Sequence, residues 1–248
     1  MEDQFVVRQV HTSLSSDSLE SAHALSVDVG SPDSIWSIFS TITYNKGKHR
    51  ASVIRMMEHF MTHETFRKGL SNYLAAHGNK TAEPDDLFAN LDSQYLLDFP
   101  NRPVSVKTVM DTWTLQSGHP VITITRNYIS GALTVTQERF YLRRSGDSTD
   151  THDYKWWVPL TYTSNTNRDF LSTTTRTWMN SASSQITINN LGASANDWVI
   201  FNVQQIGFYR VNYDAQNWAL LANYLNSESF TNIHVLNRAQ LLDDAFNL

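Results

Sequence analysis

Apolar residues recur at spacings of three and four through the first 118 residues, which predicts helices joined by short loops. One helix is expected to start at Ser31-Pro32-Asp33, because serine caps helix N-termini and proline suits the first helical position. The apolar positions of later helices are Val53, Ile54, Met57, Phe60 and Met61; Phe66, Leu70, Tyr73 and Leu74; and Val106, Val109, Met110 and Trp113. Gly118-His119-Pro120 should end this helical block.

From Val121 the apolar spacing changes to two, which is typical of β-strands. Turn residues at Ser130-Gly131 and Ser145-Gly146-Asp147 separate the first of these segments. The predicted strands cover residues 121–125, 133–136, 156–162, 185–188 and 198–203. Short strands with regular turns predict a small β-sandwich.

Helical spacing returns after Asp214, so the fold class predicted for the whole chain is α+β and multidomain. The apolar faces of the last two predicted helices are Trp218, Leu221, Ala222 and Leu225, then Leu236, Ala239, Leu242 and Phe246. A chain that ends within an amphipathic helix leaves apolar surface bare, so this pattern favours a piece of a longer protein.

Composition and charge exclude several classes of function. The apolar fraction of 41% with 12 Phe, 10 Tyr and 7 Trp indicates a folded globular chain. The net charge of −5, with acids and bases interspersed, provides no basic surface for nucleic acid. No apolar run reaches the ~20 residues of a membrane helix, and no signal peptide is recognisable at the start. The absence of cysteine excludes disulfides and thiolate metal sites within this span.

The run Tyr44-Asn45-Lys46-Gly47 and the residues around it, 37–58, resemble the segment that surrounds the catalytic tyrosine of the aminopeptidase N family. Other segments are similar to that family in the same order, so the resemblance covers nearly the whole chain. They are residues 66–74, 110–114, 118–121, 137–140, 157–160, 207–214 and 237–246. Among relatives, the chain looks most similar to the cell-surface gut aminopeptidases of arthropods.

This resemblance implies three structural units. Residues 1–118 would be the C-terminal helical part of a thermolysin-like catalytic domain, 119–213 a β-sandwich, and 214–248 the first helices of an α-helical superhelix domain. The family holds zinc through an H-E-x-x-H helix and a later glutamate, which would lie upstream of Met1. The resemblance therefore implies zinc in the full-length parent but none bound by this span.

The implied activity is removal of amino-terminal residues from peptides. Tyr44 would stabilise the oxyanion of the tetrahedral intermediate, because a phenol keeps its proton at neutral pH and donates one hydrogen bond. Phe39 resembles a position that lines the pocket for the substrate's first side chain. The competing interpretations are a Tyr44 ring that only packs and a Phe39 that belongs to the core.

The implied location is the outer face of the plasma membrane, with membrane attachment only through regions outside this span. Asn79-Lys80-Thr81 fits the acceptor pattern for an N-linked glycan, which matters only if the protein is secreted. Peptide substrates and the rest of the parent polypeptide are the expected partners, and nucleic acid is not.

Two groups of polar residues could suggest metal ligands. His59 and His63 have the i, i+4 spacing that can chelate zinc, but Phe60 stands where the metalloprotease motif requires glutamate. We therefore expect no zinc site there. Asp243 and Asp244 should lie on a helix, where adjacent side chains are not expected to face one cation.

The chain departs from the family pattern near Tyr44. Lys48-His49-Arg50 intervene before Ala51, Ser40 stands where aspartate is usual, and Ala24 stands where proline is usual. Three residues are nearly one helical turn. If a helix begins at Ala51, the insertion forms a basic loop; if the backbone is tight there, the insertion displaces Tyr44.

Three hypotheses follow. In the first, the chain is part of a zinc aminopeptidase and is inactive alone, because it lacks H-E-x-x-H. In the second, the chain belongs to a cell-surface binding protein of the same fold that has lost its catalytic activity, as the insertion and Ser40 suggest. In the third, residues 119–213 form a stand-alone β-sandwich binding module.

Overall fold

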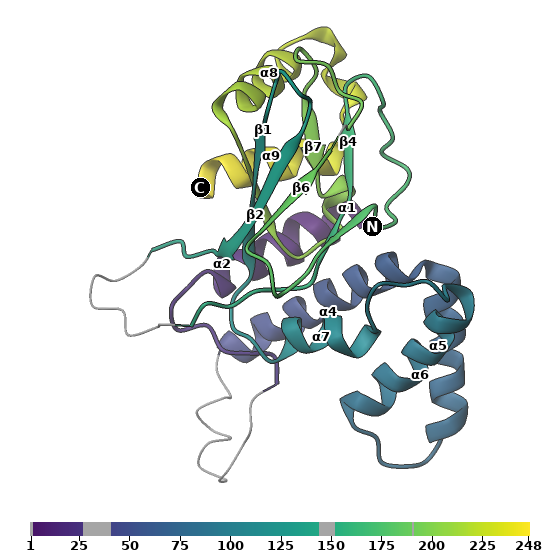
Figure 1. Cartoon of the computed structure of the whole chain (residues 1–248). Helices are drawn as coiled ribbons and strands as arrows, with labels where there is room; N and C mark the ends of the chain where they lie inside the picture. Colours follow the sequence, from purple (N-terminus) through teal and green to yellow (C-terminus); the bar gives the residue numbers. More distant parts are fainter. Residues whose placement is uncertain (1, 27–40, 144–151, 190) are drawn as a thin grey trace.

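The computed structural model describes residues 2–26, 41–143, 152–189 and 191–248 (Figure 1). Side chains of residues 41–46 are not among those described. The helix expected from Ser31 to Ile42 lies largely outside the described residues, which include only its end at Thr41 and Ile42. The described chain has helices at both ends and strands between them, so it belongs to the α+β class.

The N-terminal part is helical, as the apolar spacing predicts. One helical run contains α1 (Glu2–Phe5), the π-helical turn η1 (Val6–Val10) and α2 (His11–Asp17), with Val6, Val10 and Leu14 buried. The helices after it are α4 (Thr41–Met61), α5 (His63–His77), α6 (Pro84–Asp98) and α7 (Val106–Thr114). Apolar side chains at helical spacing give α4 its buried face, which consists of Val53, Met56, Met57, Phe60 and Met61.

Helices α5 and α6 form a hairpin that projects to one side of the molecule in Figure 1. They approach closely at Gly69, where an added Cβ would lie 2.9 Å from Leu91 Cδ2 and 3.1 Å from Leu91 Cα. Thr62 separates α4 from α5 with φ 72° and ψ 145°. This conformation is rare for a β-branched residue, so the turn between the two helices is strained.

The described strands form one four-stranded sheet and two two-stranded sheets. In the larger sheet, β6 (Gln185–Ile188), β2 (Leu133–Arg139) and β1 (Pro120–Arg126) are antiparallel neighbours, and β8 (Arg210–Tyr213) pairs with β1 in parallel. The small sheets are β3 (Val158–Leu160) with β5 (Thr177–Met179) and β4 (Tyr162–Ser164) with β7 (Val199–Phe201).

The segment predicted as one strand over residues 156–162 is in fact two strands. Thr161 interrupts it, because its backbone oxygen and its hydroxyl accept from the N–H groups of Asn202 and Val203 at 2.8 and 2.9 Å. β5 and β8 were not predicted as strands. The β-sandwich and the unit boundaries at residues 118 and 213 remain predictions.

The C-terminal part contains η2 (Val203–Gln205), α8 (Ala215–Leu225), η3 (Glu228–Asn232) and α9 (Val235–Asn247). Both predicted helices are present, but the apolar face assigned to the last one is wrong in part. Leu242 and Phe246 are 70% and 90% exposed, whereas Asp244 is buried. The helix turns a polar edge inward because Asp244 pairs with a buried arginine on β8.

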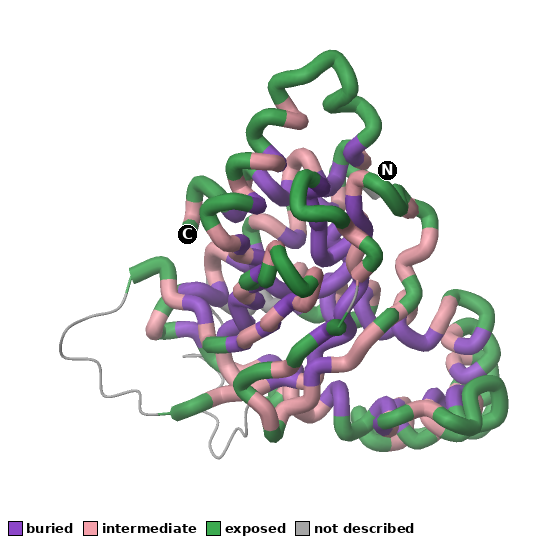
Figure 2. Tube along the Cα trace, turned by 45° about the horizontal axis from the view of Figure 1, so that its top comes forward, coloured by how far each residue is buried: buried purple, intermediate pink, exposed green. Residues whose placement is uncertain are grey.

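A single apolar core runs through the helices and the strands (Figure 2). Trp113 on α7 lies 6.1 Å from Trp156 between ring centroids, and its indole N–H donates to the backbone oxygen of Trp157 at 2.9 Å. Phe60 on α4 packs edge-on against Trp178 at 5.3 Å. The helical block therefore shares its interior with the strands.

Gly69→Ala should destabilise the folded chain by about 1–2 kcal/mol, because the new methyl group must push the Leu91 backbone away. Gly47→Ala is the matched control, since Gly47 lies in α4 with no described atom within 4 Å of its Cβ position. Alanine there should stabilise by about 0.5–1 kcal/mol through helix propensity alone. Urea unfolding of the two variants measures both changes, and equal effects would contradict the close approach of α5 and α6.

His119 is fully buried, with Nε2 lying 3.0 Å from the backbone oxygen of Leu14. Burial, helped by the nearby Arg210 charge, lowers the pKa of His119 to about 4, although Asp17 acts in the opposite direction. Between pH 4 and 6.5 the unfolded chain therefore binds a proton that the folded chain does not. The stability that this neutral imidazole contributes is present above pH 6.5 and is lost as the pH falls.

The free energy of unfolding of the natural chain, minus that of His119→Gln, should fall by up to roughly 3 kcal/mol between pH 7 and pH 4. Glutamine cannot titrate, so its variant lacks this slope. His23→Gln, at an exposed position, is the control and should keep the natural slope. Chemical denaturation at a series of pH values gives the curves, and parallel curves for the natural chain and His119→Gln would refute the assignment.

Candidate active-site helix

Helix α4 carries the predicted oxyanion donor. Tyr44 lies in its first turns, whereas the apolar pattern favours a helix that starts near Ser31 and carries Tyr44 at its far end. The side chain of Tyr44 is not among those described, and Phe39 and Ser40 lie outside the described residues. The structure therefore places the backbone at Tyr44 and the contacts that hold its helix.

The insertion Lys48-His49-Arg50 is helical. α4 runs from Thr41 to Met61 without a break, which contradicts one of the two alternatives, a helix that begins at Ala51 after a basic loop. Within this stretch of α4, the Ser52 hydroxyl donates to the Lys48 oxygen at 2.8 Å. The Arg50 guanidinium donates to the Leu25 oxygen at 2.9 Å.

His49 points into the protein from this insertion. It is 1% exposed, and its Nδ1 forms an ion pair with the carboxylate of Asp17 on α2. Its ring stacks on Phe208, with ring centroids 4.2 Å apart and an interplanar angle of 19°. The residue that sequence reasoning assigned to a surface loop is thus one of the buried contacts of α4.

Two further contacts attach α4 to the part of the chain that carries the strands. Arg55 donates to the backbone oxygen of Gln205 at 2.9 Å, and His59 Nδ1 lies 2.8 Å from the hydroxyl of Thr173. Both side chains come from the same helix as His49. α4 is therefore held against α2, against residues 204–208 and against Thr173.

The segment that receives Arg55 has an unusual backbone. Asn202, Gln204 and Gln205 have φ values of 61°, 54° and 49°, each in the left-handed region. Such residues cost on the order of 1–3 kcal/mol each and persist only where their surroundings hold them. Asn237 on α9 does so here, because its amide donates to the Asn202 oxygen at 2.9 Å and accepts from the Gln204 N–H at 2.8 Å.

The segment 207–214, which carries part of the family resemblance, is structural. Gly207 is required because a Cβ would lie 2.1 Å from Cε1 of Tyr209. Arg210 is fully buried, and its Nη1 lies 2.7 Å from Asp243 Oδ2 and 2.9 Å from Asp244 Oδ1. The expectation that these adjacent aspartates would not face one group is wrong, because both carboxylates contact Nη1 of Arg210, which is a side chain and not a metal ion.

The two histidines with zinc-like spacing have separate partners. His59 contacts Thr173, whereas His63 is exposed and its Nδ1 lies 2.5 Å from Glu58 Oε1. Among the described residues, no three His, Cys, Asp or Glu side chains come together as a metal site.

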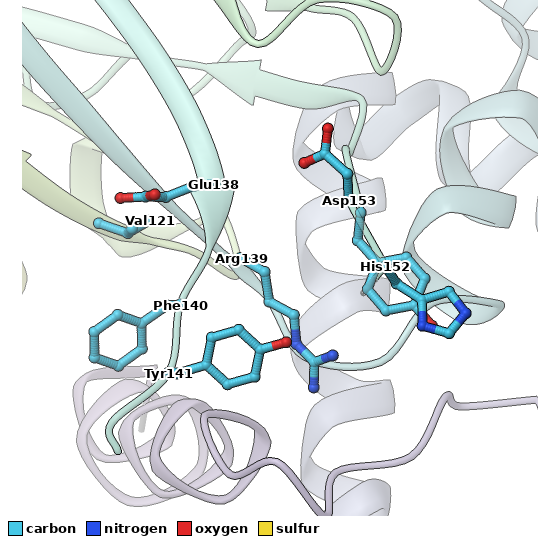
Figure 3. Close-up of a pocket in the computed structure, with 8 residues that line it drawn as sticks. Val121, Glu138, Arg139, Phe140, Tyr141, His152 and Asp153 are labelled. Atoms are coloured by element: carbon cyan, nitrogen blue, oxygen red, sulfur yellow. The ribbon is translucent and has the colours of Figure 1, made fainter. Parts of the chain in front are cut away.

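Two hollows were not anticipated from the sequence. The first, with a volume of about 350 Å³, places the Arg139 guanidinium 4.5 Å from the ring centre of Tyr141 and 5.5 Å from that of Tyr154 (Figure 3). Two charged residues followed by two aromatic residues at 138–141 are the signal that could have indicated it. It is lined by Val121, Glu138, Arg139, Phe140, Tyr141, His152, Asp153 and Tyr154.

The second hollow, of about 720 Å³, lies where α4 and α6 end beside β5. Its aromatic lining consists of Phe60, Tyr95, Phe99 and Trp178. Arg102 and Arg176 also line it, and each is already paired with a carboxylate, Asp92 and Asp169 respectively.

Comparison with known proteins agrees with the sequence pattern. Residues 1–113 match the peptidase family M1 domain, and residues 198–248 match the ERAP1-like C-terminal domain. The chain is 40% identical to a membrane alanyl aminopeptidase of Heliothis virescens over 98% of its own length and 24% of that protein. It is 36% identical to aminopeptidase N of Rattus norvegicus and to the thyrotropin-releasing hormone-degrading ectoenzyme of Homo sapiens, with full coverage of this chain and 25% and 23% of those proteins.

The chain belongs to the M1 family of aminopeptidases, the family of aminopeptidase N. The predicted likeness to arthropod enzymes is supported by the identities of 37–40% with proteins from three moths. The chain spans about a quarter of the length of the curated relatives it matches. Within the described residues, no helix has the length and apolar character that crossing a membrane requires.

Arg210→Met should cost about 3–5 kcal/mol of folding free energy, because it leaves the buried carboxylate of Asp244 without its cation. Arg176→Met removes an exposed ion pair with Asp169 and should cost less than about 1 kcal/mol. Thermal or urea unfolding of the two variants tests the difference. Similar losses in both would show that burial of the Arg210 pair does not matter.

Proposed function

We propose that this chain works within a zinc-dependent aminopeptidase that removes amino-terminal residues from peptides, and that Tyr44 donates the hydrogen bond that stabilises the oxyanion. Membership of the M1 family, over a match that includes α4, is the observation that carries the proposal. The described residues do not fit a zinc site, so we assign the metal to parts of the enzyme outside this span.

The chemistry assigned to Tyr44 is limited and specific. Attack on a peptide carbonyl places negative charge on its oxygen, and a donor aimed at that oxygen lowers the barrier. The phenol suits this role because its pKa of about 10 keeps the proton in place at neutral pH. A well-placed donor of this kind contributes about 2.7–4 kcal/mol to transition-state stabilisation.

Such a donor must be held precisely, because a displacement of about 1 Å can cost ~100-fold in rate. The anchoring of α4 supports the proposal on this point. The ion pair of His49 with Asp17, the bond from Arg55 to Gln205 and the contact of His59 with Thr173 all fix the helix that carries Tyr44.

For Phe39 we propose a place in the pocket that receives the substrate's first side chain. This assignment depends on the family resemblance alone, because Phe39 lies outside the described residues.

We further propose that the enzyme acts on the outer face of the plasma membrane. The matched relatives include proteins named membrane alanyl aminopeptidase and ectoenzyme, which supports this location. Attachment to the membrane is assigned to regions outside this span. Asn79, in the turn between α5 and α6, is exposed and is accessible to a glycan.

In the zinc-loaded enzyme that contains this chain, Tyr44→Phe should lower kcat on amino-acyl substrates by about 10²–10³-fold and leave KM nearly unchanged. Tyr73→Phe on α5 is the control, because its ring only stacks on His77, and it should keep full activity. The isolated 248-residue chain should show no zinc-dependent turnover.

Two results would contradict the proposal. Full activity of Tyr44→Phe would remove the tyrosine from the reaction. A natural enzyme that folds, binds zinc and still fails to hydrolyse any amino-acyl substrate would favour the alternative, a binding protein of the same fold that has lost its activity.

A further inference from the structure

We propose that His49 and Asp17 form a positioning pair, which fixes the first turns of α4 and thereby sets the place of Tyr44. The catalytic part of this inference rests on the proposed function; the part that concerns the helix does not.

The geometry of the pair is that of a built contact. His49 comes from α4 and Asp17 from the last turn of α2, and their side chains are 1% and 4% exposed. Nδ1 of the imidazole faces Oδ2 of the carboxylate. Because two lone pairs would repel at this contact, a hydrogen lies between the two atoms and joins the side chains in a hydrogen bond.

The surroundings of His49 restrict its ring to one orientation. Phe208, itself fully buried, lies flat against the imidazole at 4.2 Å. Arg210 and Asp17 both influence the buried His119, in opposite directions. An interior of this kind excludes water, so loss of the contact between the two side chains is costly.

The position of His49 along α4 gives the pair its role. Among the α4 side chains that the structure describes, residues 47–61, His49 is the first that is buried. The other described polar anchors, Arg50, Arg55 and His59, lie further along α4 from Tyr44. Tyr44 precedes His49 by five residues, which is about 7.5 Å along a helix axis.

A helix end that extends past its last tertiary contact frays, because its amides then depend on local hydrogen bonds alone. Among the described side chains, the pair of His49 and Asp17 is the buried contact nearest to Tyr44, and it limits this fraying. Since the backbone between the two residues is helical, a rotation or shift at His49 is transmitted directly to Tyr44.

Hydrogen exchange of the 248-residue chain tests the structural part. Amides of residues 42–48 should exchange at least tenfold faster in Asp17→Asn and in His49→Gln, while α5 and α6 keep their natural protection. The matched control is Glu58→Gln, which breaks the pair between Glu58 at the far end of α4 and the exposed His63 of α5 and should leave residues 42–48 unchanged. Natural protection of residues 42–48 in both single variants would overturn the proposal.

The double variant Asp17→Asn/His49→Gln keeps the proposal testable if a single variant fails to fold. It replaces both members of the pair with neutral side chains. Its loss of stability should be smaller than the sum of the two single losses, which shows that the residues act as a pair. Additive losses would mean that the two side chains contribute independently, against the proposal.

Kinetics in the zinc-loaded enzyme test the catalytic part. His49→Gln should lower kcat at least tenfold with KM within about twofold of the natural value, and should cause no further loss in the Tyr44→Phe background. Equal losses in both backgrounds would show a role unconnected with Tyr44. An inactive natural enzyme would refute the proposed function and the catalytic part together, and the exchange experiment would still decide whether the pair holds the helix.

Discussion

Charged groups that are cut off from water must find partners inside the protein, and residues 202–210 are where this chain brings several of them together. Arg210 binds two aspartates of α9, Gln205 accepts from Arg55 of α4, and Phe208 supports the ion pair between α4 and α2. The strained backbone at Asn202, Gln204 and Gln205 lies at the same junction. Helices α2, α4 and α9 therefore meet at one short segment, residues 202–210, whose polar contacts tolerate little displacement.

Apolar spacing was sufficient to predict helices whose packing depends on one apolar face. α7, β1 and β2 follow the spacing, whereas α5 is present but buries Thr65 and Gly69 and leaves Leu74 of its predicted face 61% exposed. It failed where a specific polar contact decides the outcome. α9 turns Asp244 inward because Arg210 needs a partner. Thr161 divides the predicted strand at 156–162 because it accepts hydrogen bonds from Asn202 and Val203 of the same chain. Neither contact leaves a periodic signal.

In the candidate site, too, one feature could be predicted from the sequence and others could not. Tyr44 was found by resemblance to a family, since a single tyrosine in a sequence carries no chemical signature of its own. The contacts that hold its helix could not be predicted, because His49 looks like part of a basic surface run until the fold brings Asp17 and Phe208 to it. The hollow around Arg139 was missed for a related reason, because residues far apart in sequence complete it.

The core that passes from Trp113 to Trp156 without interruption bears on how such a protein can be inherited. Separation of the chain near residue 118 would expose the facing surfaces of both tryptophans, so neither part is suited to fold as a separate domain. Recombination or gene fission at that point would be selected against, and the helices and strands should descend together, with compensating changes on the two sides of their shared interior.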